Sequence, residues 1–230
     1  LKVLRNSLLI SFYRLLWGFP APIVLALMLN ELPSKKFRKI SQTAIYLPHF
    51  ISWVVLVGIV QTFLSPSGGL INIVLEAMGK PSVAFLQKPE YFRTIIVATD
   101  VWKETGWGTI MYLAALSGIN PELYEAAMID GANKWQRLIH VTIPNMMPSI
   151  TICTFLTITN SFKLFDQNLS LTGGEPMHQT EMMALNIYDT FYGRVGYEGV
   201  GQAKAVIFFI IVVAIGMIQL YATKSKEVQQ

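Results

Sequence analysis

The sequence predicts an all-α protein that crosses a lipid bilayer several times. Of its 230 residues, 53% are hydrophobic and only 14% are charged, whereas soluble domains carry about 25% charged residues. The mean hydropathy is +0.46. Five apolar runs are each long enough to cross the hydrocarbon layer as a helix. The sequence lacks the alternation of apolar and polar residues that is typical of strands in a membrane β-barrel. Lipid offers no hydrogen-bonding partner to the backbone of an open segment, so helices are expected.

The five apolar runs define the predicted spans of a single membrane domain, residues 1–230. The runs cover residues 7–29, 44–64, 91–116, 145–165 and 203–223. The third run is the least apolar, because it contains Asp100, Lys103 and Glu104. These three residues lie within about one helical turn, so a local salt bridge among them is expected.

The orientation of the spans follows from basic residues, which concentrate in short cytoplasmic connections. The dense basic cluster at residues 35–39 and the basic tail predict that both face the cytoplasm. Alternation then places residues 65–90 and 166–202 outside the membrane and residues 118–144 inside. The first span would start outside, so a full chain that begins in the cytoplasm would have a sixth span upstream.

Several chemistries find no support in the sequence. The net charge of +4 belongs to cytoplasmic loops and headgroup contacts, and no basic stripe with interleaved aromatic residues indicates nucleic acid. Gly79-Lys80 is followed by proline and lacks the upstream glycine of a phosphate-binding loop. The three histidines lack metal-ligand spacing, and the single Cys153 excludes a disulfide. We expect no catalytic residue, metal or cofactor in this chain, and a structural hydrogen bond for His49.

A polar, small-residue segment, "LYEAAMIDGANKWQRLIHVTIP" at residues 123–144, separates the third and fourth runs. Residues 120–121, Asn-Pro, predict a helix start. Asp130-Gly131 predicts a break, because glycine tolerates the left-handed turn at a helix C-terminus. A second short helix should start near Asn133 and stop at Pro144, before the fourth span.

This segment has two physical interpretations. It could be an amphipathic connector that lies on lipid headgroups, a role that favours bulky anchors and basic residues. Its surface instead has almost no side chains, because Ala126, Ala127, Gly131 and Ala132 are small. Small residues permit close approach of another protein, so a docking element is the favoured interpretation.

Specific stretches resemble a known family. "EAAMIDGA" followed by "IHVTIP" resembles the EAA loop of ABC-importer permeases. "YLPHFISWVV" at residues 46–55 and "LTGGEP" at residues 171–176 are similar to sugar permeases of the maltose-transporter type, and "LYEAA" with "FDQNLSLTGGEP" resembles their first, F-type subunit. The resemblance implies a type I ABC importer permease core in the bacterial inner membrane. It would move a sugar or oligosaccharide by alternating access.

The resemblance also implies partners and a coupling loop. The partners would be the lipid bilayer, a second, G-type permease subunit, two ATPase subunits that bind ATP and Mg, and an extracytoplasmic solute-binding protein that docks near the outer loop. The implied coupling residues are Glu125, Ala126, Ala127, Asp130, Gly131, Ala132 and Pro144. Glu125 would pair with a basic group of the ATPase. Trp135, Leu138 and Ile139 would pack the loop against the permease's own helices.

Two polar stretches within the spans, "WKETGWG" and "TITNSFKLF", are candidates for the solute pathway. Aromatic faces beside amides and carboxylates suit a polyol, although interhelical hydrogen bonding is an equally good explanation for any single residue. With the resemblance, the predicted pathway residues are Trp102, Glu104, Thr105, Gly106, Trp107, Thr157, Asn160, Ser161 and Leu164. Lys103 and Lys163 indicate either an anionic oligosaccharide or pairing with Glu104 and Asp166.

Two other functions remain open from the sequence. An ion-coupled secondary transporter would use the intramembrane charges, but would leave residues 121–144 without an ATPase to dock. An ABC permease for amino acids, peptides or phosphate would share the coupling loop. The stretches at residues 46–55 and 171–176 argue against that second alternative.

Overall fold

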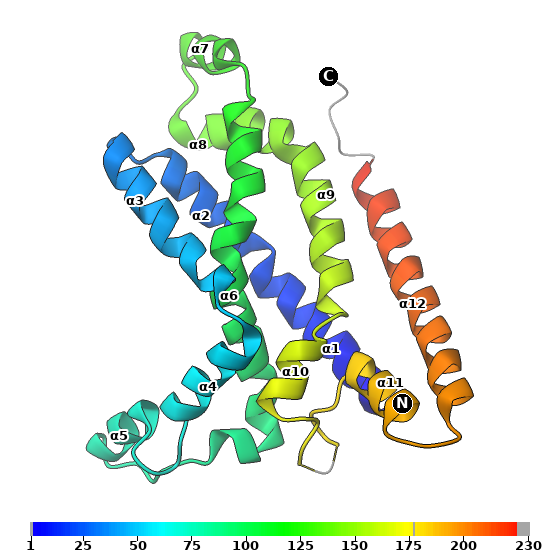
Figure 1. Cartoon of the computed structure of the whole chain (residues 1–230). Coiled ribbons are helices and arrows are strands. Elements are labelled where there is room, and N and C mark those ends of the chain that lie inside the picture. Colours follow the sequence, from blue (N-terminus) through cyan, green and yellow to red (C-terminus); the bar gives the residue numbers. More distant parts are fainter. Residues whose placement is uncertain (1, 177, 225–230) are drawn as a thin grey trace.

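The computed structural model describes residues 2–176 and 178–224, and the regular elements in these ranges are all helices (Figure 1). The long helices are α1 (Lys2–Gly18), α2 (Pro20–Asn30), α3 (Lys35–Tyr46), α4 (Trp53–Phe63), α6 (Pro89–Ser117), α9 (Ile143–Ser161) and α12 (Glu198–Lys224). Short elements connect them: η1 (Leu47–Phe50), α5 (Leu70–Ala77), η2 (Phe85–Gln87), α7 (Pro121–Ile129), α8 (Lys134–Arg137), the π-helical turn η3 (Leu138–Thr142), α10 (Phe165–Leu171) and α11 (Met183–Tyr192).

Helix α6 stands at the centre of the bundle, and α1, α2, α3 and α9 pack against it (Figure 1). Two apolar clusters form the core. One joins α1, α4, α6 and α10 through buried side chains such as Ile10, Val57 and Ile96. The other joins α2, α6 and α9 through Ala26, Tyr112 and Met146, among others. The position of α6 therefore fixes the positions of its neighbours.

The predicted inner and outer segments gather at opposite ends of the molecule (Figure 1). The α2–α3 connection, α7 and the end of α12 lie at one end, whereas α5, α10 and α11 lie at the other. The predicted outer loop is largely helical and folds into the bundle: Gln167 on α10 donates a hydrogen bond of 2.8 Å to the carbonyl of Ile96 on α6. Which end faces the cytoplasm stays a prediction.

Three helical rods of the described chain are long and apolar enough to cross a membrane: Lys2–Asn30, Lys134–Ser161 and Glu198–Thr223. They correspond to the first, fourth and fifth predicted spans. The third predicted span lies within α6, which has 29 residues but carries Asp100, Lys103 and Glu104 in its middle. These charges explain why α6 is less apolar than the three rods named above.

The second predicted span is a bent pair of helices, so the expectation of one uninterrupted helix over residues 44–64 is wrong. Lys35–Phe50 and Trp53–Phe63 pass the same test only together, and they are bent by 96° at the break between them. The break follows Pro48 and ends at Ser52, whose hydroxyl caps the next helix by accepting the N–H of Val55. The basic cluster at residues 35–39 opens helix α3 and is not an irregular connection.

The expected helix stop at Pro144 is also wrong. The helix that begins at Lys134 continues through Pro144 to Ser161, with a π-helical turn at Leu138–Thr142. Proline lacks the N–H donor that an α-helix interior needs. Here it falls at the start of α9, directly after the π turn, where the hydrogen-bonding pattern already changes.

At Gly106, helix α6 lies very close to the backbone of α3. A Cβ atom at this position would lie 1.8 Å from the carbonyl oxygen of Ile45. Glycine is therefore required for the two helices to pack as they do. The sequence predicts that Gly106 lines the pathway, but in the structure it serves the close packing of α3 and α6.

We predict that Gly106→Ala destabilises the protein by about 1–3 kcal/mol, because the added methyl group forces two backbones apart. Thermal unfolding of the purified protein in detergent would measure this. Gly58→Ala on α4 is the matched control, since a Cβ there has no neighbour within 4 Å and alanine favours the helix. Equal melting temperatures for wild type and Gly106→Ala would contradict the packing role.

Candidate functional site

The predicted coupling segment projects from one end of the molecule (Figure 1). Helix α7 has no buried residue, and Ile129 is 87% exposed. The helix begins as predicted: the side chain of Asn120 accepts the N–H of Glu122 at 3.1 Å, and Pro121 occupies the first turn. In the described part of the chain Glu125 is exposed and makes no ion pair. Its carboxylate is therefore free to meet a partner.

The break after α7 has the geometry that the sequence predicts. Gly131 adopts a φ of +78°, in the region that favours glycine. Asn133 then caps α8, and Asn133 and Gln136 each accept the other's backbone N–H, at 2.9 and 2.8 Å. The hydroxyl groups of Tyr124 and Thr142 lie 3.0 Å apart and link α7 to the π turn. The segment is thus fixed to the helix that continues into α9.

Apart from Pro144, which lies in α9, the other coupling residues lie on the surface of this segment. A shallow depression of about 280 Å³ is lined in part by Ala127, Asp130, Gly131 and Ala132, and Ala126 is exposed beside it. Trp135 and Leu138 share a cavity with Leu27 of α2 and Leu116 of α6, so they face the chain's own helices as expected, although Trp135 and Ile139 are still 68% and 41% exposed. Helix α8 lies between α7 and the start of α9 and crosses the end of α6 (Figure 1).

A second candidate site is a cavity of about 330 Å³ between α1, α2, α6 and α9, called here the central cavity. Its lining includes five predicted pathway residues: Glu104, Thr105, Trp107, Thr157 and Asn160. The structure therefore brings the two polar stretches "WKETGWG" and "TITNSFKLF" together in space. Hydroxyl, amide, carboxylate and indole groups converge there, a combination that suits a polar ligand.

The four remaining pathway residues lie outside the central cavity. Gly106 packs against Ile45, as described above. Ser161 is 1% exposed and donates a hydrogen bond of 2.6 Å to the carbonyl of Ile158, and Leu164 belongs to the apolar core. Trp102 is 54% exposed and lines a different cavity.

An ion pair joins α1 to α6 beside the central cavity. The Nε atom of Arg14 lies 2.5 Å from Oδ2 of Asp100, and both side chains are nearly buried. Both residues line the cavity, and Arg14 Nη1 and Asp100 Oδ1 have no hydrogen-bond partner among the described residues. Neither residue is among the pathway residues predicted from the sequence, because their contact depends on helix packing.

A second polar cluster joins η1 to α6. His49 Nδ1 lies 2.8 Å from Glu104 Oε2, and its ring stacks on Trp107 with centroids 4.4 Å apart. Lys103 donates to the carbonyl oxygen of His49 and lies 3.4 Å from Glu104 Oε1. The expected hydrogen bond of His49 is confirmed. The local salt bridge is confirmed for Lys103 and Glu104, whereas Asp100 pairs with Arg14.

Lys163 differs from Lys103 in its surroundings. It is exposed, and it makes no ion pair with Asp166 in the ranges that the structure describes. Lys163 therefore does not pair with Asp166 within this subunit, so that predicted alternative is wrong. The turn between α9 and α10 separates the two side chains.

Comparison with known proteins identifies the class. Residues 18–225 match the sequence model of the family described as "Binding-protein-dependent transport system inner membrane component". The chain belongs to this family. It is a multi-pass inner-membrane permease subunit of a binding-protein-dependent sugar or polysaccharide ABC importer, and a separate subunit binds and hydrolyses ATP. The resemblance drawn from the EAA-type segment and the sugar-permease stretches is confirmed.

Particular relatives refine this comparison. Protein LplB of Bacillus subtilis is 36% identical over 92% of this chain and 68% of the relative. The polygalacturonan/rhamnogalacturonan transport system permease protein YteP of the same organism is 36% identical over 91% of this chain and 67% of the relative.

Solved structures agree with the sequence relatives. A bacterial ABC transporter that imports the acidic polysaccharide alginate superposes with a TM-score of 0.90 at 36% identity, covering 97% of this chain and 78% of that one. A second structure of an alginate transporter, in complex with a periplasmic protein bound to an alginate pentasaccharide, has a TM-score of 0.88 at 38% identity, with 95% and 76% coverage. Members of this class therefore work with a periplasmic solute-binding protein and ABC transporter partners.

We predict that Asp100→Asn lowers the stability of the subunit by about 3–5 kcal/mol, because it leaves the Arg14 guanidinium buried without a counter-charge. The double variant Arg14→Met, Asp100→Leu should recover most of this loss. Thermal unfolding in detergent would compare them, with Lys163→Gln as the control for an exposed, unpaired cation. Equal losses in the single and double variants would contradict a buried ion pair.

Proposed function

We propose that the central cavity is one wall of the pathway for an oligosaccharide, completed by a second, G-type permease subunit. The observation that carries this proposal is the convergence of Glu104, Thr105, Trp107, Thr157 and Asn160 on one cavity. The free polar atoms of Arg14 and Asp100 add a donor and an acceptor for sugar hydroxyl groups. The stacked rings of His49 and Trp107 add an aromatic wall.

We further propose that α7 and α8 dock on one of two ATPase subunits. Exposed small residues permit close seating, and the exposed Glu125 is available for a basic group of the ATPase. The continuous helical rod Lys134–Ser161 joins this segment to Thr157 and Asn160 at the central cavity. Movement of the docked segment would therefore displace one wall of the pathway, and the pathway would open alternately to the two sides of the membrane.

The two alternatives from the sequence are less well supported. An ion-coupled transporter needs an intramembrane charge that is free to take up and release its ion, whereas Asp100, Lys103 and Glu104 each have an ionic partner. An amino acid ABC transporter superposes with a TM-score of 0.57 at 16% identity, and this likeness concerns the fold alone.

We predict that Gly131→Asp abolishes transport while the subunit still inserts and folds. At a φ of +78° an aspartate strains the turn by about 1–3 kcal/mol and adds a charge to the docking surface. Gly79→Asp is the matched control, because Gly79 has a φ of +73° and equal free space at the opposite end of the molecule. Transport in proteoliposomes would be measured for both. Unchanged transport by Gly131→Asp would contradict the coupling role.

We also predict that Trp107→Ala and Asn160→Ala each reduce sugar transport about tenfold or more, because each removes about 1–3 kcal/mol of contact with the passing sugar. ATP hydrolysis without sugar should stay within about twofold of wild type. Met111→Ala is the control, since Met111 lines the same cavity without a polar group. If all three variants transport equally well, the central cavity is not the pathway.

A further inference from the structure

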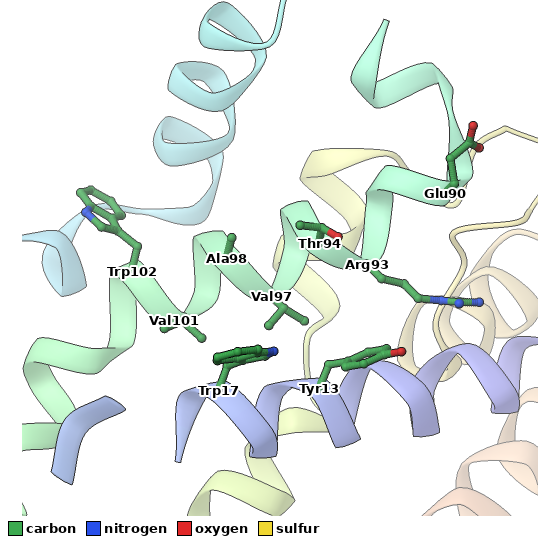
Figure 2. Close-up of a pocket in the computed structure, with 9 residues that line it drawn as sticks. All are labelled: Tyr13, Trp17, Glu90, Arg93, Thr94, Val97, Ala98, Val101 and Trp102. Atoms are coloured by element: carbon green, nitrogen blue, oxygen red, sulfur yellow. The ribbon is translucent and has the colours of Figure 1, made fainter. Parts of the chain in front are cut away.

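A larger cavity lies between the second half of α1 and the first half of α6 (Figure 2). It has a volume of about 750 Å³ and is called here the outer cavity. Its lining comprises Tyr13, Trp17, Glu90, Arg93, Thr94, Val97, Ala98, Val101 and Trp102. Val101 also lines the central cavity, so the two cavities adjoin along α6. A solute that enters from the predicted outer end would pass the outer cavity first.

Aromatic faces line much of the outer cavity. Tyr13 and Trp17 lie side by side on α1, opposite Val97 and Val101 on α6 (Figure 2). Trp17 and Trp102 are 62% and 54% exposed, so large indole surfaces are available to a ligand. Indole and phenol rings offer rigid apolar faces with a polar edge, and the C–H face of a sugar ring can stack on them.

Arg93 supplies an unpaired positive charge at the outer end of this cavity. It is half-buried, and among the described residues it has no hydrogen bond or ion pair. Glu90, one turn earlier on α6, is exposed and also forms no ion pair with Arg93. A guanidinium group binds a carboxylate through two parallel hydrogen bonds, which a hydroxyl group cannot match.

The cavity has the length for more than one sugar unit. Arg93 and Trp102 lie at its opposite ends (Figure 2), nine residues apart on α6, which corresponds to about 14 Å along the helix. Its volume falls in the range of about 300–1,000 Å³ that is usual for small-molecule sites. An oligosaccharide segment can therefore lie along α6 with one ring over Tyr13 and Trp17.

We propose that the outer cavity is a subsite for an acidic oligosaccharide, with Arg93 binding a sugar carboxylate and with Tyr13 and Trp17 stacking under the sugar ring. The inference rests on the proposed function, because it names the substrate class of the same pathway. The alginate importer described above shows that a relative with 36% identity and a TM-score of 0.90 imports an acidic polysaccharide. Arg93 is thus a specificity residue that selects uronate-containing chains before they reach the central cavity.

The test uses the complete importer in proteoliposomes, with its second permease subunit, ATPase and binding protein. Transport would be measured for uronate oligosaccharides from alginate and pectin and for neutral maltotetraose. Arg93→Gln should reduce transport of the best uronate about tenfold and that of the neutral sugar less than about twofold, because only the acidic sugar loses a charge-assisted contact. Every variant uses the same binding protein, so the affinity of that protein for each sugar does not affect the comparison between variant and wild type.

Two further variants sharpen the result. Lys88→Gln removes a positive charge next to the same end of α6 without touching the cavity, and it should have no effect. Trp17→Ala should reduce transport of acidic and neutral sugars alike, because stacking does not depend on charge. Transport of a neutral sugar alone by the wild type would overturn the inference, as would equal losses for both sugar classes in Arg93→Gln.

The behaviour of Asn160→Ala and Arg93→Gln side by side separates this inference from the proposed function. If Asn160→Ala loses transport but Arg93→Gln behaves as wild type, the central pathway stands and the outer subsite is wrong. If no oligosaccharide in the panel is transported, both are wrong. Failure of Arg93→Gln to assemble would assign Arg93 to a subunit contact, and dependence on anionic lipid would assign it to a lipid phosphate. Either of these results would also overturn the subsite.

Discussion

The structure depends on how the charged middle of α6 is accommodated within an apolar helical bundle. Ionisable groups at membrane depth are costly unless they are paired. Asp100 is paired with Arg14 on α1, while Lys103 and Glu104 are held by each other and by His49 at the bend between α3 and α4. These contacts fix the positions of α1 and of the broken span relative to α6. Arg14 Nη1 and Asp100 Oδ1 keep no hydrogen-bond partner within the described residues, at the wall of the central cavity. The same charges therefore serve helix packing and the pathway proposed here.

The sequence predicts those features that depend on local chemistry. Hydropathy locates the three long apolar helices that correspond to the first, fourth and fifth predicted spans. Asn120, Pro121 and Gly131 predict the beginning and end of α7, because caps and glycine turns are local interactions. The 96° bend within the second span is not predicted, since the apolar run continues through it. The contact between Arg14 and Asp100 joins residues 86 positions apart. Only the packing of α1 on α6 brings them together.

The two candidate regions of this subunit lie at the ends of one continuous helix. The rod Lys134–Ser161 begins in the predicted coupling segment and carries Thr157 and Asn160 at the central cavity. The π turn near its start and the contact between Tyr124 and Thr142 fix α7 to this rod. In the proposed mechanism, a displacement of α7 reaches Thr157 and Asn160 through this helix, because the Tyr124–Thr142 contact bypasses the turn at Gly131. This continuity explains why a capped helix suits this position better than a short loop.

The most direct test is an electron cryomicroscopy structure of the assembled importer, trapped with an oligosaccharide in the membrane domain. We expect sugar density against Trp107 and Asn160, with α7 seated on an ATPase subunit. Sugar density that contacts neither of these residues, or an α7 that faces lipid headgroups, would contradict the pathway and the coupling role proposed here.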